Sequence, residues 1–465
     1  MTRRLHATSI TLRTAKSKSW EFFCESVKDV NATSKLYRLL SKDPVDHLAL
    51  LHTTTEDGQI VTNPNKRIEN LLKTHFPGSR IVPPDFANPD TREINVEGHS
   101  RIMANRIVSE EKVRWAFSSF KPFKAAGTDG IQPVHIKEGI SHLVGPLTKV
   151  YIASLELGHV PIPWRKAKVT FIPKPGKPNY NEAKMFRPIS LTSFLLKGLE
   201  RLVERHIRDT SLTESTLCRA QHAYQTGSGT ETALHDLTVR IERAISRKQY
   251  AMGCFLDIQG AFDNVKTNAI VAALNKKEVD PIIVRWIAQM LRTRTVTTKM
   301  GDTEVVAAIE KGCPQGGVLS PLCWLLVVDS LLAELNAQHL FTQGYADDLV
   351  ILIEGFNLET ISGIMQRALH CVQKWCTDNG LAVNPKKTEL ILFTKRRNTP
   401  DQTNIQLNGT VLHFADKTKY LGVILDRKLN FREHVKTKCE KAVSCLMHCK
   451  RIASQRCTQN DEVYI

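Results

Sequence analysis

One stretch of the sequence carries two adjacent carboxylates between two apolar runs: Phe341-Thr342-Gln343-Gly344-Tyr345-Ala346-Asp347-Asp348-Leu349-Val350-Ile351-Leu352-Ile353. Its pattern predicts a β-hairpin from Gly344 to Glu354. Adjacent carboxylates repel each other and lose hydration when they are partly buried, so solvent or cations must offset their charge. Divalent cations are the obvious compensation, although an ordinary surface turn containing aspartates would show the same four residues.

A second acidic strand lies about ninety residues earlier, in Phe255-Leu256-Asp257-Ile258-Gln259-Gly260-Ala261-Phe262-Asp263. The continuous apolar run predicts a buried strand from Met252 to Asp257, and side chains emerge into a cleft where such a strand ends. Magnesium prefers oxygen ligands, usually a few carboxylates together with substrate phosphates. Two ions roughly 3.5 to 4 Å apart can activate a hydroxyl and stabilise a leaving pyrophosphate. Asp257 with Asp347 would hold both ions, and Asp348 would add negative charge nearby.

The rest of the chain alternates between helical and strand periodicity. We expect helices over Ile102–Phe120, Phe194–Ile207, Thr230–Arg247, Val318–Leu335 and Ile361–Cys376, strands over Val169–Pro173, Thr295–Met300, Leu390–Phe393 and Tyr420–Leu425, a linker over Pro77–Asp90 and a structured loop over Lys121–Gly130. An α+β architecture, with an antiparallel sheet flanked by helices, follows from this order.

The composition indicates a folded, basic protein. The 465 residues are 42% hydrophobic and 24% charged, and 64 Lys and Arg against 47 Asp and Glu leave a net charge of +17. A positive excess concentrates polyanions, so nucleic acid is the leading partner and an anionic membrane the second. The longest apolar run, Leu322–Val328, is closed by Asp329, which is too short for a membrane-spanning helix. We therefore expect no membrane partner.

Two local features allow alternative interpretations. The first twenty residues are basic and rich in Ser and Thr, which superficially suits a mitochondrial transit peptide, but a segment that contacts nucleic acid explains the same residues and is the preferred interpretation. A group of potential metal ligands occurs near the end of the sequence: Cys439, Cys445, His448, Cys449 and Cys457. Their spacing matches neither a zinc ribbon nor a zinc knuckle, so thiols on an ordinary helix are the preferred interpretation.

The order of the motifs strongly resembles the reverse transcriptases of non-LTR retrotransposons, the LINE-type jockey-like elements in particular. Three motifs carry this order: Asp257-x4-Phe262, Pro314-Gln315-Gly316-Gly317-Val318-Leu319-Ser320-Pro321-Leu322, and Tyr345-Ala346-Asp347-Asp348. Flanking passages match as well: Lys121 to Gly130, Phe171 to Lys177, Phe186 to Leu191, Gly380 to Thr388, and Tyr420 to Asp426. The resemblance covers roughly residues 100 to 435.

The resemblance implies a catalytic centre built on acidic residues. Asp257, Asp347 and Asp348 would be catalytic, and together with Ile258 they would form the metal site. Its cofactor would be two Mg²⁺ ions, with Mn²⁺ as a substitute. The reaction would be RNA-directed DNA synthesis, in which a primer 3′-hydroxyl attacks a deoxynucleoside triphosphate and pyrophosphate leaves.

The resemblance also implies contacts to the incoming nucleotide. Lys174 and Arg187 would meet the triphosphate, with Lys177 competing for the role of Lys174. Phe262 would act as a steric gate that excludes the ribose 2′-hydroxyl, although a plain core phenylalanine is an alternative.

Two further residues would line the same nucleotide site. Gln315 would lie beside the template base, while its neighbouring glycines would equally suit a helix-entry turn. Lys387, with Lys386 adjacent, would assist the departure of pyrophosphate. Tyr420–Leu425 would hold the primer terminus, although its tyrosine and leucines would also suit any core.

The implied fold is the right-hand polymerase arrangement of fingers, palm with antiparallel sheet, and partial helical thumb, after a helical N-terminal extension. We expect a basic, mainly helical extension over 1–100, a lead-in to the fingers over 101–154, fingers and palm over 155–426, and the start of a truncated thumb over 427–465. No endonuclease or ribonuclease H motif occurs in the sequence, so we expect a fragment of the element's second open reading frame protein.

The expected partners are an RNA template, a DNA primer or target DNA, and deoxynucleoside triphosphates. Nuclear action follows from the lifestyle of related elements, with a cytoplasmic ribonucleoprotein as the alternative. Two rival interpretations stay open. One is a catalytically inactive, element-derived remnant that binds nucleic acid, and the other is a relative of mobile-intron maturases or telomerase.

Overall fold

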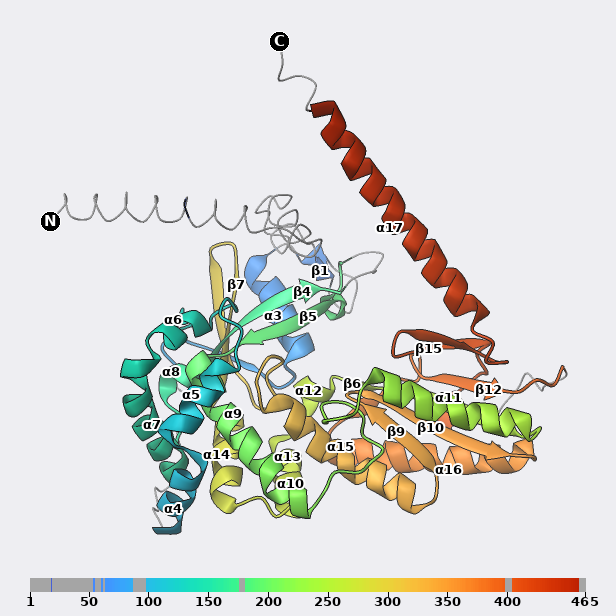
Figure 1. The fold of residues 1–465 in the computed structure, drawn as a ribbon, viewed down its shortest axis with the longest axis horizontal. Helices are drawn as coiled ribbons and strands as arrows, with labels where there is room; N and C mark the ends of the chain where they lie inside the picture. The colour runs from blue at the N-terminus through green and yellow to red at the C-terminus, as the bar shows by residue number, and fades with distance from the viewer. Residues whose placement is uncertain are drawn as a thin grey trace.

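Five strands that carry or flank both acidic motifs form the first of the two five-stranded sheets in the described part of the computed structural model (Figure 1). The structure describes Lys18 and residues 53–54, 60–61, 63–86, 98–174, 180–397 and 404–459. The first sheet consists of β6 (Tyr250–Gln259), β9 (Phe341–Tyr345), β10 (Asp348–Gly355), β11 (Ala382–Val383) and β12 (Glu389–Phe393). Its order is β11-β6-β10-β9, and β12 pairs with β6 beside β11. Every pairing in this sheet is antiparallel, as predicted.

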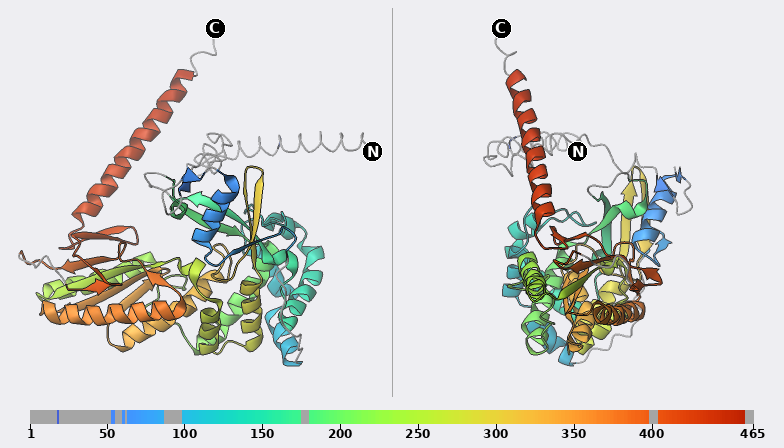
Figure 2. Two further views of the ribbon diagram at one scale, coloured as in Figure 1. Left: turned by 180° about the vertical axis from the view of Figure 1, so that it is seen from behind. Right: turned by 90° about the vertical axis from the view of Figure 1, so that its right-hand side faces the viewer.

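Side chains of the two central strands alternate between two cores. On β6, Met252, Cys254 and Leu256 belong to the main core, which contains α16 (Leu358–Asn379) and α15 (Ser320–Ala337). The intervening Ala251 and Phe255 belong to a second core, which contains α11 (Thr230–Ser246). Figures 1 and 2 show α11 and α16 on opposite faces of the first sheet. The period of two therefore puts helices on both faces.

The second sheet has the order β3-β8-β7-β4-β5. Its strands are β3 (Arg80–Val82), β4 (Lys166–Pro173), β5 (Phe186–Leu191), β7 (Thr295–Met300) and β8 (Thr303–Ala308). Strands β4 and β7 pair in parallel, unlike the wholly antiparallel sheet that was expected. The chain between these strands runs through a 3-10 helix, six α-helices, β5 and β6, and such a long crossover permits parallel pairing.

The N-terminal part of the chain contributes to the second sheet. Helix α3 (Pro64–His75) packs Ile68, Leu71 and Leu72 against its strands. The expected linker over Pro77–Asp90 is wrong in part, because β3 lies inside it and pairs with β8. Most of the extension expected over 1–100, including the basic first twenty residues, lies outside the described residues apart from Lys18. The division into four segments stays a prediction.

The remaining elements are helices and short hairpins. The helices are α4 (Gly98–Ile107), α5 (Glu110–Ser118), α6 (Pro133–Glu138), α7 (Ile140–Leu157), α8 (Ile162–Arg165), the 3-10 helix η1 (Ala183–Met185), α9 (Phe194–Asp209), α10 (Ser211–Glu214), α12 (Ala261–Asn264), α13 (Thr267–Lys276), α14 (Pro281–Arg292) and α17 (Arg432–Gln459). The hairpins are β1 (Thr53–Thr54) with β2 (Ile60–Val61), β13 (Gln406–Leu407) with β14 (Thr410–Val411), and β15 (Lys417–Tyr420) with β16 (Val423–Asp426).

Two predicted elements are divided in the structure. The helix expected over Ile102–Phe120 consists of α4 and α5, because the Ser109 hydroxyl accepts the backbone N–H of Lys112 and begins a new helix. The single strand expected over Tyr420–Leu425 contains the turn of the β15–β16 hairpin, where Leu421 and Gly422 both have positive φ angles, so its residues divide between the two strands.

Helix α15 is the interior helix of the main core. Within the described residues it is long and apolar enough to cross a membrane by length and composition, but 67% of this stretch is buried inside the protein. It contacts α13, α16 and β9. Burial on these sides accounts for its apolar composition without a membrane.

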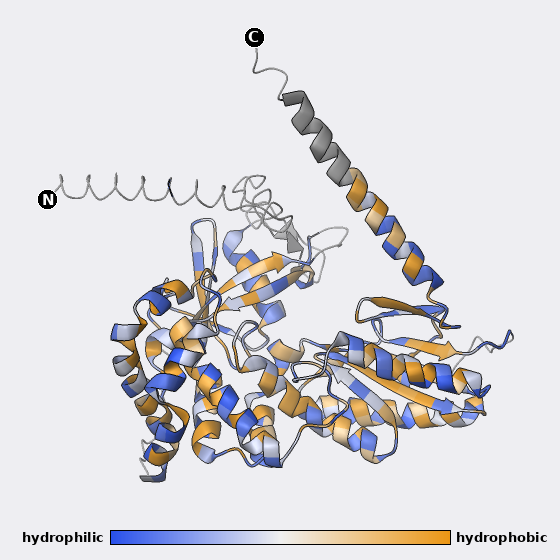
Figure 3. Ribbon diagram, viewed as in Figure 1, coloured by the Kyte–Doolittle hydropathy of each residue, from blue (hydrophilic) through white to orange (hydrophobic). Residues whose placement is uncertain are grey.

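Helix α17 leaves the body of the molecule (Figures 1 and 2). Its first turns are joined to the β15–β16 hairpin by the Lys417–Glu433 ion pair at 3.2 Å and by the N–H of Ile424, which donates to His434 Nδ1. Apolar and polar residues mix along its described part (Figure 3). Cys439 and Cys445 are exposed on this helix, and the side chains of the other three ligand candidates lie outside the description.

Candidate active site

The β6–β10 pairing brings the two acidic motifs together. Asp348 lies directly opposite Asp257, and the backbone N–H of Ile258 donates to the carbonyl of Asp347 at 3.4 Å. Opposite residues of an antiparallel pair have Cβ atoms roughly 4.5–5.5 Å apart. Asp257 and Asp348 therefore share one face at the end of the sheet, and Asp347 lies in the turn beside them.

The turn that carries Asp347 is a strained, anchored hairpin. Tyr345 pairs with Asp348, so Ala346 and Asp347 alone connect β9 to β10. Ala346 has a φ of +56°, a left-handed conformation that is costly for a residue with a side chain. The indole N–H of Trp324, which lies on the buried helix α15, donates to the carbonyl of Ala346 at 2.6 Å. The main core thus fixes the position of this turn.

Burial and crowding raise the pKa values of the two aspartates in the turn. Burial is the main cause of the raised pKa of Asp347, and Asp257 raises it further, while Lys387 and Arg187 oppose the shift. Burial, then Asp347 and Asp257, raise the pKa of Asp348 to about 6. A cation bound beside these carboxylates would oppose the effects of burial and mutual repulsion and favour their ionised forms.

Lys387 makes a direct ion pair with the site. Its Nζ lies 2.6 Å from Asp257 Oδ2, and its side chain is 62% exposed. It belongs to the turn after β11, where Lys387 and Thr388 donate backbone N–H groups to the carbonyl of Asn384. Because β11 pairs with the end of β6, this turn stays close to Asp257.

A cleft of about 1050 Å³ opens in front of these groups. Most of the predicted site residues line it: Lys174, Arg187, Asp257, Ile258, Phe262, Gln315, Asp347 and Lys387. Asp348 does not line the cleft, and Lys177 lies outside the described residues. The fold therefore brings eight of the nine predicted residues to one cavity.

Two of the cations that line the cleft come from the second sheet. Arg187 lies on β5, opposite Ile172 of β4, and is exposed. Lys174 follows β4, and its Nζ donates to the carbonyl of Lys184 at 2.7 Å. Both cations are positioned to face an anion that enters the cleft.

Phe262 and Gln315 line the cleft from α12 and from the loop that precedes α15. Phe262 packs against Trp324 with ring centroids 6.2 Å apart. Gln315 belongs to the glutamine loop, residues 314–319, and its carbonyl accepts the backbone N–H of Ser190 on β5. Gly316, with a φ of +126°, lies so close to Ser190 that a Cβ would be 2.6 Å from its carbonyl oxygen. Glycine is therefore required for this approach.

Two carboxylates that hold the glutamine loop were not assigned a role from sequence. Asp263 Oδ2 accepts the Gln315 side-chain N–H at 2.7 Å. Glu200, which is fully buried on α9, accepts the backbone N–H groups of Val318 and Leu319, the latter at 3.0 Å. The sequence contains one signal for the role of Glu200. This charged residue directly follows Leu199 in the predicted amphipathic helix, beside its apolar face.

Comparison with protein families shows which family contains this arrangement of motifs. The family model for reverse transcriptase (RNA-dependent DNA polymerase) matches residues 172–425, which is more than half of the chain. The chain belongs to the reverse transcriptase family. The antiparallel first sheet, which carries the acidic turn, fits the palm of this right-hand polymerase fold.

Curated relatives agree with this family. The probable RNA-directed DNA polymerase from transposon BS of Drosophila melanogaster is 28% identical over 354 residues, 75% of this chain and 39% of that protein. The RNA-directed DNA polymerase from mobile element jockey of Drosophila funebris is 30% identical over 373 residues, 79% of this chain and 40% of that protein. The expected membership among the non-LTR reverse transcriptases is confirmed. The chain spans about two fifths of the length of these two relatives.

A solved structure shows a weaker likeness. Apo telomerase from Candida Tropicalis, truncated from its C-terminal domain, aligns with a TM-score of 0.38 and 11% identity, over 58% of this chain and 54% of that one. A TM-score this low carries no argument. The fold assignment rests on the family match and on the strand pairing around the acidic turn.

Reverse transcriptases in general use divalent metal ions, and the donor set here suits them. The described residues contain no group of three or more His, Cys, Asp or Glu side chains at metal-binding spacing. Asp257 and Asp347 are nevertheless the kind of sparse carboxylate set that holds magnesium when substrate phosphates supply further ligands. Burial and the nearby Asp257 raise the pKa of Asp347, and a bound cation would favour its ionised form.

Proposed function

We propose that the chain catalyses RNA-directed addition of deoxynucleotides to the 3′-hydroxyl of a DNA primer. The 3′-oxygen attacks the α-phosphorus of the incoming triphosphate, and the bond to pyrophosphate breaks as the new phosphodiester bond forms. The hydroxyl proton passes to solvent. The observation that carries the proposal is the register that sets Asp257 opposite Asp348, beside Asp347 and a cleft lined by cations, in a chain of the reverse transcriptase family.

The proposed cofactor is a pair of Mg²⁺ ions, which Mn²⁺ would replace. When bound, such ions lower the pKa of the attacking hydroxyl and stabilise charge on the leaving pyrophosphate. Asp257 and Asp347 would hold them with carboxylate oxygens, and Ile258 with its main-chain carbonyl, the only oxygen it has. Asp348 contributes negative charge from the neighbouring position.

The other residues of the cleft orient the substrates. Arg187 and Lys174 bind the triphosphate, and the Arg187 guanidinium suits paired contacts to phosphate oxygens. Phe262 limits the space beside the sugar, and Gln315 lies against the nascent base pair. Lys387 already contacts Asp257 and assists the departure of pyrophosphate.

The proposed partners are an RNA template, a DNA primer or target DNA, and deoxynucleoside triphosphates, without a membrane. The net charge of +17 supports binding to these polyanions. The relatives named above come from a transposon and a mobile element, and this supports action in the nucleus, where target DNA lies. A cytoplasmic ribonucleoprotein would be a second location for the same protein.

Primer extension tests the proposal. With a DNA primer on an RNA template and Mg²⁺ or Mn²⁺, we expect extension by the unmutated chain. Asp347→Ala should lower its rate by roughly two orders of magnitude or more, because a metal ligand is removed. Asp302→Ala, in the exposed turn between β7 and β8, is the matched control and should keep full activity.

The inactive-remnant alternative predicts a different result. It requires that the unmutated chain binds the template–primer but extends it no faster than Asp347→Ala does. Chelation of divalent ions, followed by their restoration, separates metal dependence from loss of folding. An RNA template should support extension at least as well as a DNA template of the same sequence, or the RNA-directed part of the proposal is wrong.

A further inference from the structure

The segment between α10 and α11 extends the palm sheet beyond β9. The backbone N–H of His222 donates to the carbonyl of Gly344 at 2.9 Å, and the N–H of Gly344 donates to the carbonyl of Ala220 at 2.8 Å. Gln221 forms a parallel bridge with Gly344. Residues 220–222 thus add a short strand-like contact to the outer edge of β9, next to the acidic turn.

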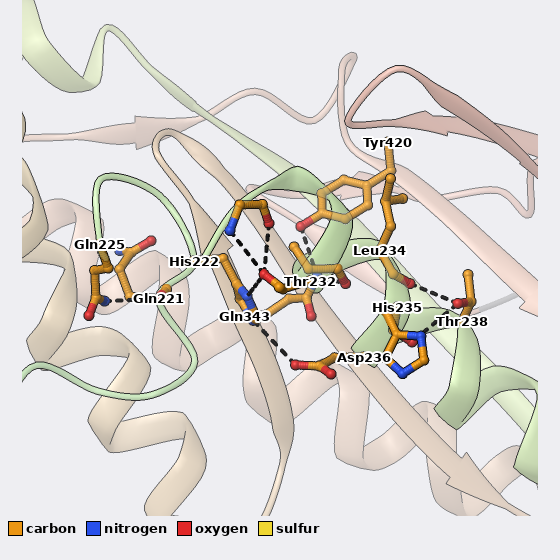
Figure 4. A network of polar contacts seen from close by, with 12 residues as sticks. Gln221, His222, Gln225, Thr232, Leu234, His235, Asp236, Thr238, Gln343 and Tyr420 are labelled. Carbon is orange, nitrogen blue, oxygen red and sulfur yellow. Dashed lines mark hydrogen bonds and ion pairs between the residues drawn. The ribbon is translucent and has the colours of Figure 1, made fainter. Parts of the chain in front are cut away.

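Side chains fix the same segment (Figure 4). The His222 ring lies 3.2 Å from the Thr232 hydroxyl and 3.7 Å from Asp236 Oδ2. Gln225 donates its side-chain N–H to the carbonyl of Gln221 at 2.8 Å. These contacts tie the segment to α11 as well as to β9, so its tip is held in one position.

Gln343 connects this edge to the β15–β16 hairpin. Its side-chain nitrogen donates to the carbonyl of Ala233 at 3.0 Å and to the hydroxyl of Tyr420 at 2.9 Å (Figure 4). Strand β9, helix α11 and the hairpin are therefore joined through one buried amide. The segment at residues 220–225 rests on this assembly.

The tip presents Tyr224 to the cleft. Its side chain is 50% exposed although the preceding Ala223 is buried, and it lines the cavity that contains Asp257 and Asp347. Its φ of +54° is a left-handed conformation that only a well-supported segment maintains in a residue with a side chain. A half-exposed aromatic ring that is held rigidly in a strained conformation at a cleft contributes little to a core.

The position of Tyr224 favours one side of the reaction. Burial raises the pKa of its hydroxyl, and the charges of Asp347 and Tyr345 raise it further, so these are its electrostatic neighbours. The cations Lys174 and Arg187 line the cleft from the second sheet instead. Tyr224 lines it from the segment on the outer edge of β9, next to the acidic turn. Under the proposed function the two cations bind the triphosphate, which leaves the β9 side of the cleft for the primer end.

We propose that Tyr224 is a stacking contact for a nucleobase of the template–primer duplex next to the growing end. The proposal rests on the polymerase function proposed above. An aromatic face accepts any base, which suits an enzyme whose selection comes from base pairing. Neither the sequence motifs nor the comparisons assign a role to this residue.

Binding and stacking measurements test this contact without any chemistry. Fluorescence anisotropy with a DNA primer on an RNA template, without nucleotide, should show that Tyr224→Ala weakens binding by about tenfold, within the range of a lost aromatic stack. Tyr224→Phe and Tyr224→Trp should bind within about threefold of the unmutated chain, since both keep a ring. Phe123→Ala, at an aromatic residue that is 80% exposed and does not line the cleft, is the control and should change nothing.

A fluorescent base analogue at the primer terminus reports the stack itself. 2-Aminopurine should be quenched in the complex with the unmutated chain and brighter in the complex with Tyr224→Ala. An unchanged dissociation constant, a loss restricted to the KM for deoxynucleotide, or equal losses in Tyr224→Ala and Tyr224→Phe would each overturn the proposal. If Tyr224→Ala does not fold, Tyr224→Leu, which keeps the bulk but has no aromatic ring, replaces it in both measurements. Extension by the unmutated chain tests the polymerase function separately.

Discussion

At the scale of single residues, Asp263 shows how the cleft is supported from below. Its carboxylate holds Gln315, yet its other oxygen is buried without a hydrogen-bond partner. Burial raises its pKa to about 7, against the opposing effects of Arg294 and Gln315. The loop that carries Gln315 therefore depends on a side chain that is close to its titration point near neutral pH.

This pKa predicts how stability varies with pH. The folded chain keeps the Asp263 proton up to about pH 7, whereas the unfolded chain releases it near the ordinary value of 3.8. The stabilisation by this proton is complete below pH 4 and is lost as the pH rises through 7. Asp263→Asn keeps an acceptor for Gln315 but has no proton to lose. Urea unfolding should show that the free energy of unfolding declines between pH 4 and pH 8 in the unmutated chain. In Asp263→Asn this decline should be smaller by on the order of 2–4 kcal/mol.

The exposed Asp302 gives the control for this measurement. Asp302→Asn should follow the pH profile of the unmutated chain. Parallel profiles for Asp263→Asn and the unmutated chain would mean that Asp263 is ionised in the folded state at all these pH values.

At the scale of elements, the apolar helix α15 contains one buried ion pair. Asp329 Oδ2 lies 2.8 Å from Lys277 Nζ, and its Oδ1 accepts the backbone N–H of Cys218 at 2.6 Å. Lys277 also donates to the carbonyl of Thr216. These contacts join α15 to the end of α13 and to the segment that precedes Tyr224.

Removal of one partner should be far worse than removal of both. Asp329→Leu leaves Lys277 buried without a counter-charge, so we expect the free energy of unfolding to fall by roughly 3–5 kcal/mol. The double variant Asp329→Leu with Lys277→Met should recover at least half of this loss, as measured by urea unfolding. A double variant that is as unstable as Asp329→Leu would show that the hydrogen bond to Cys218, and not the ion pair, is the main contribution.

The same scale shows what sequence could predict. The strand Thr295–Met300 and the helix that begins at Phe194 were predicted closely, because their periodicity is local and strong. Strand β3 was missed, because three residues carry little pattern and its partner β8 lies more than two hundred residues later. The turn at Leu421 was hidden inside a continuous apolar run.

The candidate site divides in the same way. The acidic residues and Gln315 lie in short motifs that the sequence displays directly. The contacts that position them, from Asp263 to Gln315 and from Glu200 to Val318, join residues 52 and 118 positions apart. No local pattern indicates such pairs, so the supporting carboxylates needed the structure.

At the scale of the whole molecule, the net charge of +17 predicts binding that depends on salt. Each phosphate that the protein neutralises releases counterions, so affinity falls as a power of the salt concentration. The dissociation constant for template–primer should rise by roughly tenfold or more between 50 and 200 mM salt. In a plot of the logarithm of the dissociation constant against the logarithm of the salt concentration, Tyr224→Ala should shift the line without changing its slope, because stacking releases no counterions. A dissociation constant that is independent of salt would contradict the electrostatic account.

The pairing of β6 with β10 also limits how the gene can change in length. Loss of one codon within β10 would move each later side chain to the opposite face of the sheet and exchange the two cores. An added codon at the exposed tip formed by Gly301 and Asp302 would disturb no such alternation. The gene can therefore gain a codon at the tip of the β7–β8 hairpin, whereas the number of residues from Asp348 to Gly355 has to stay the same.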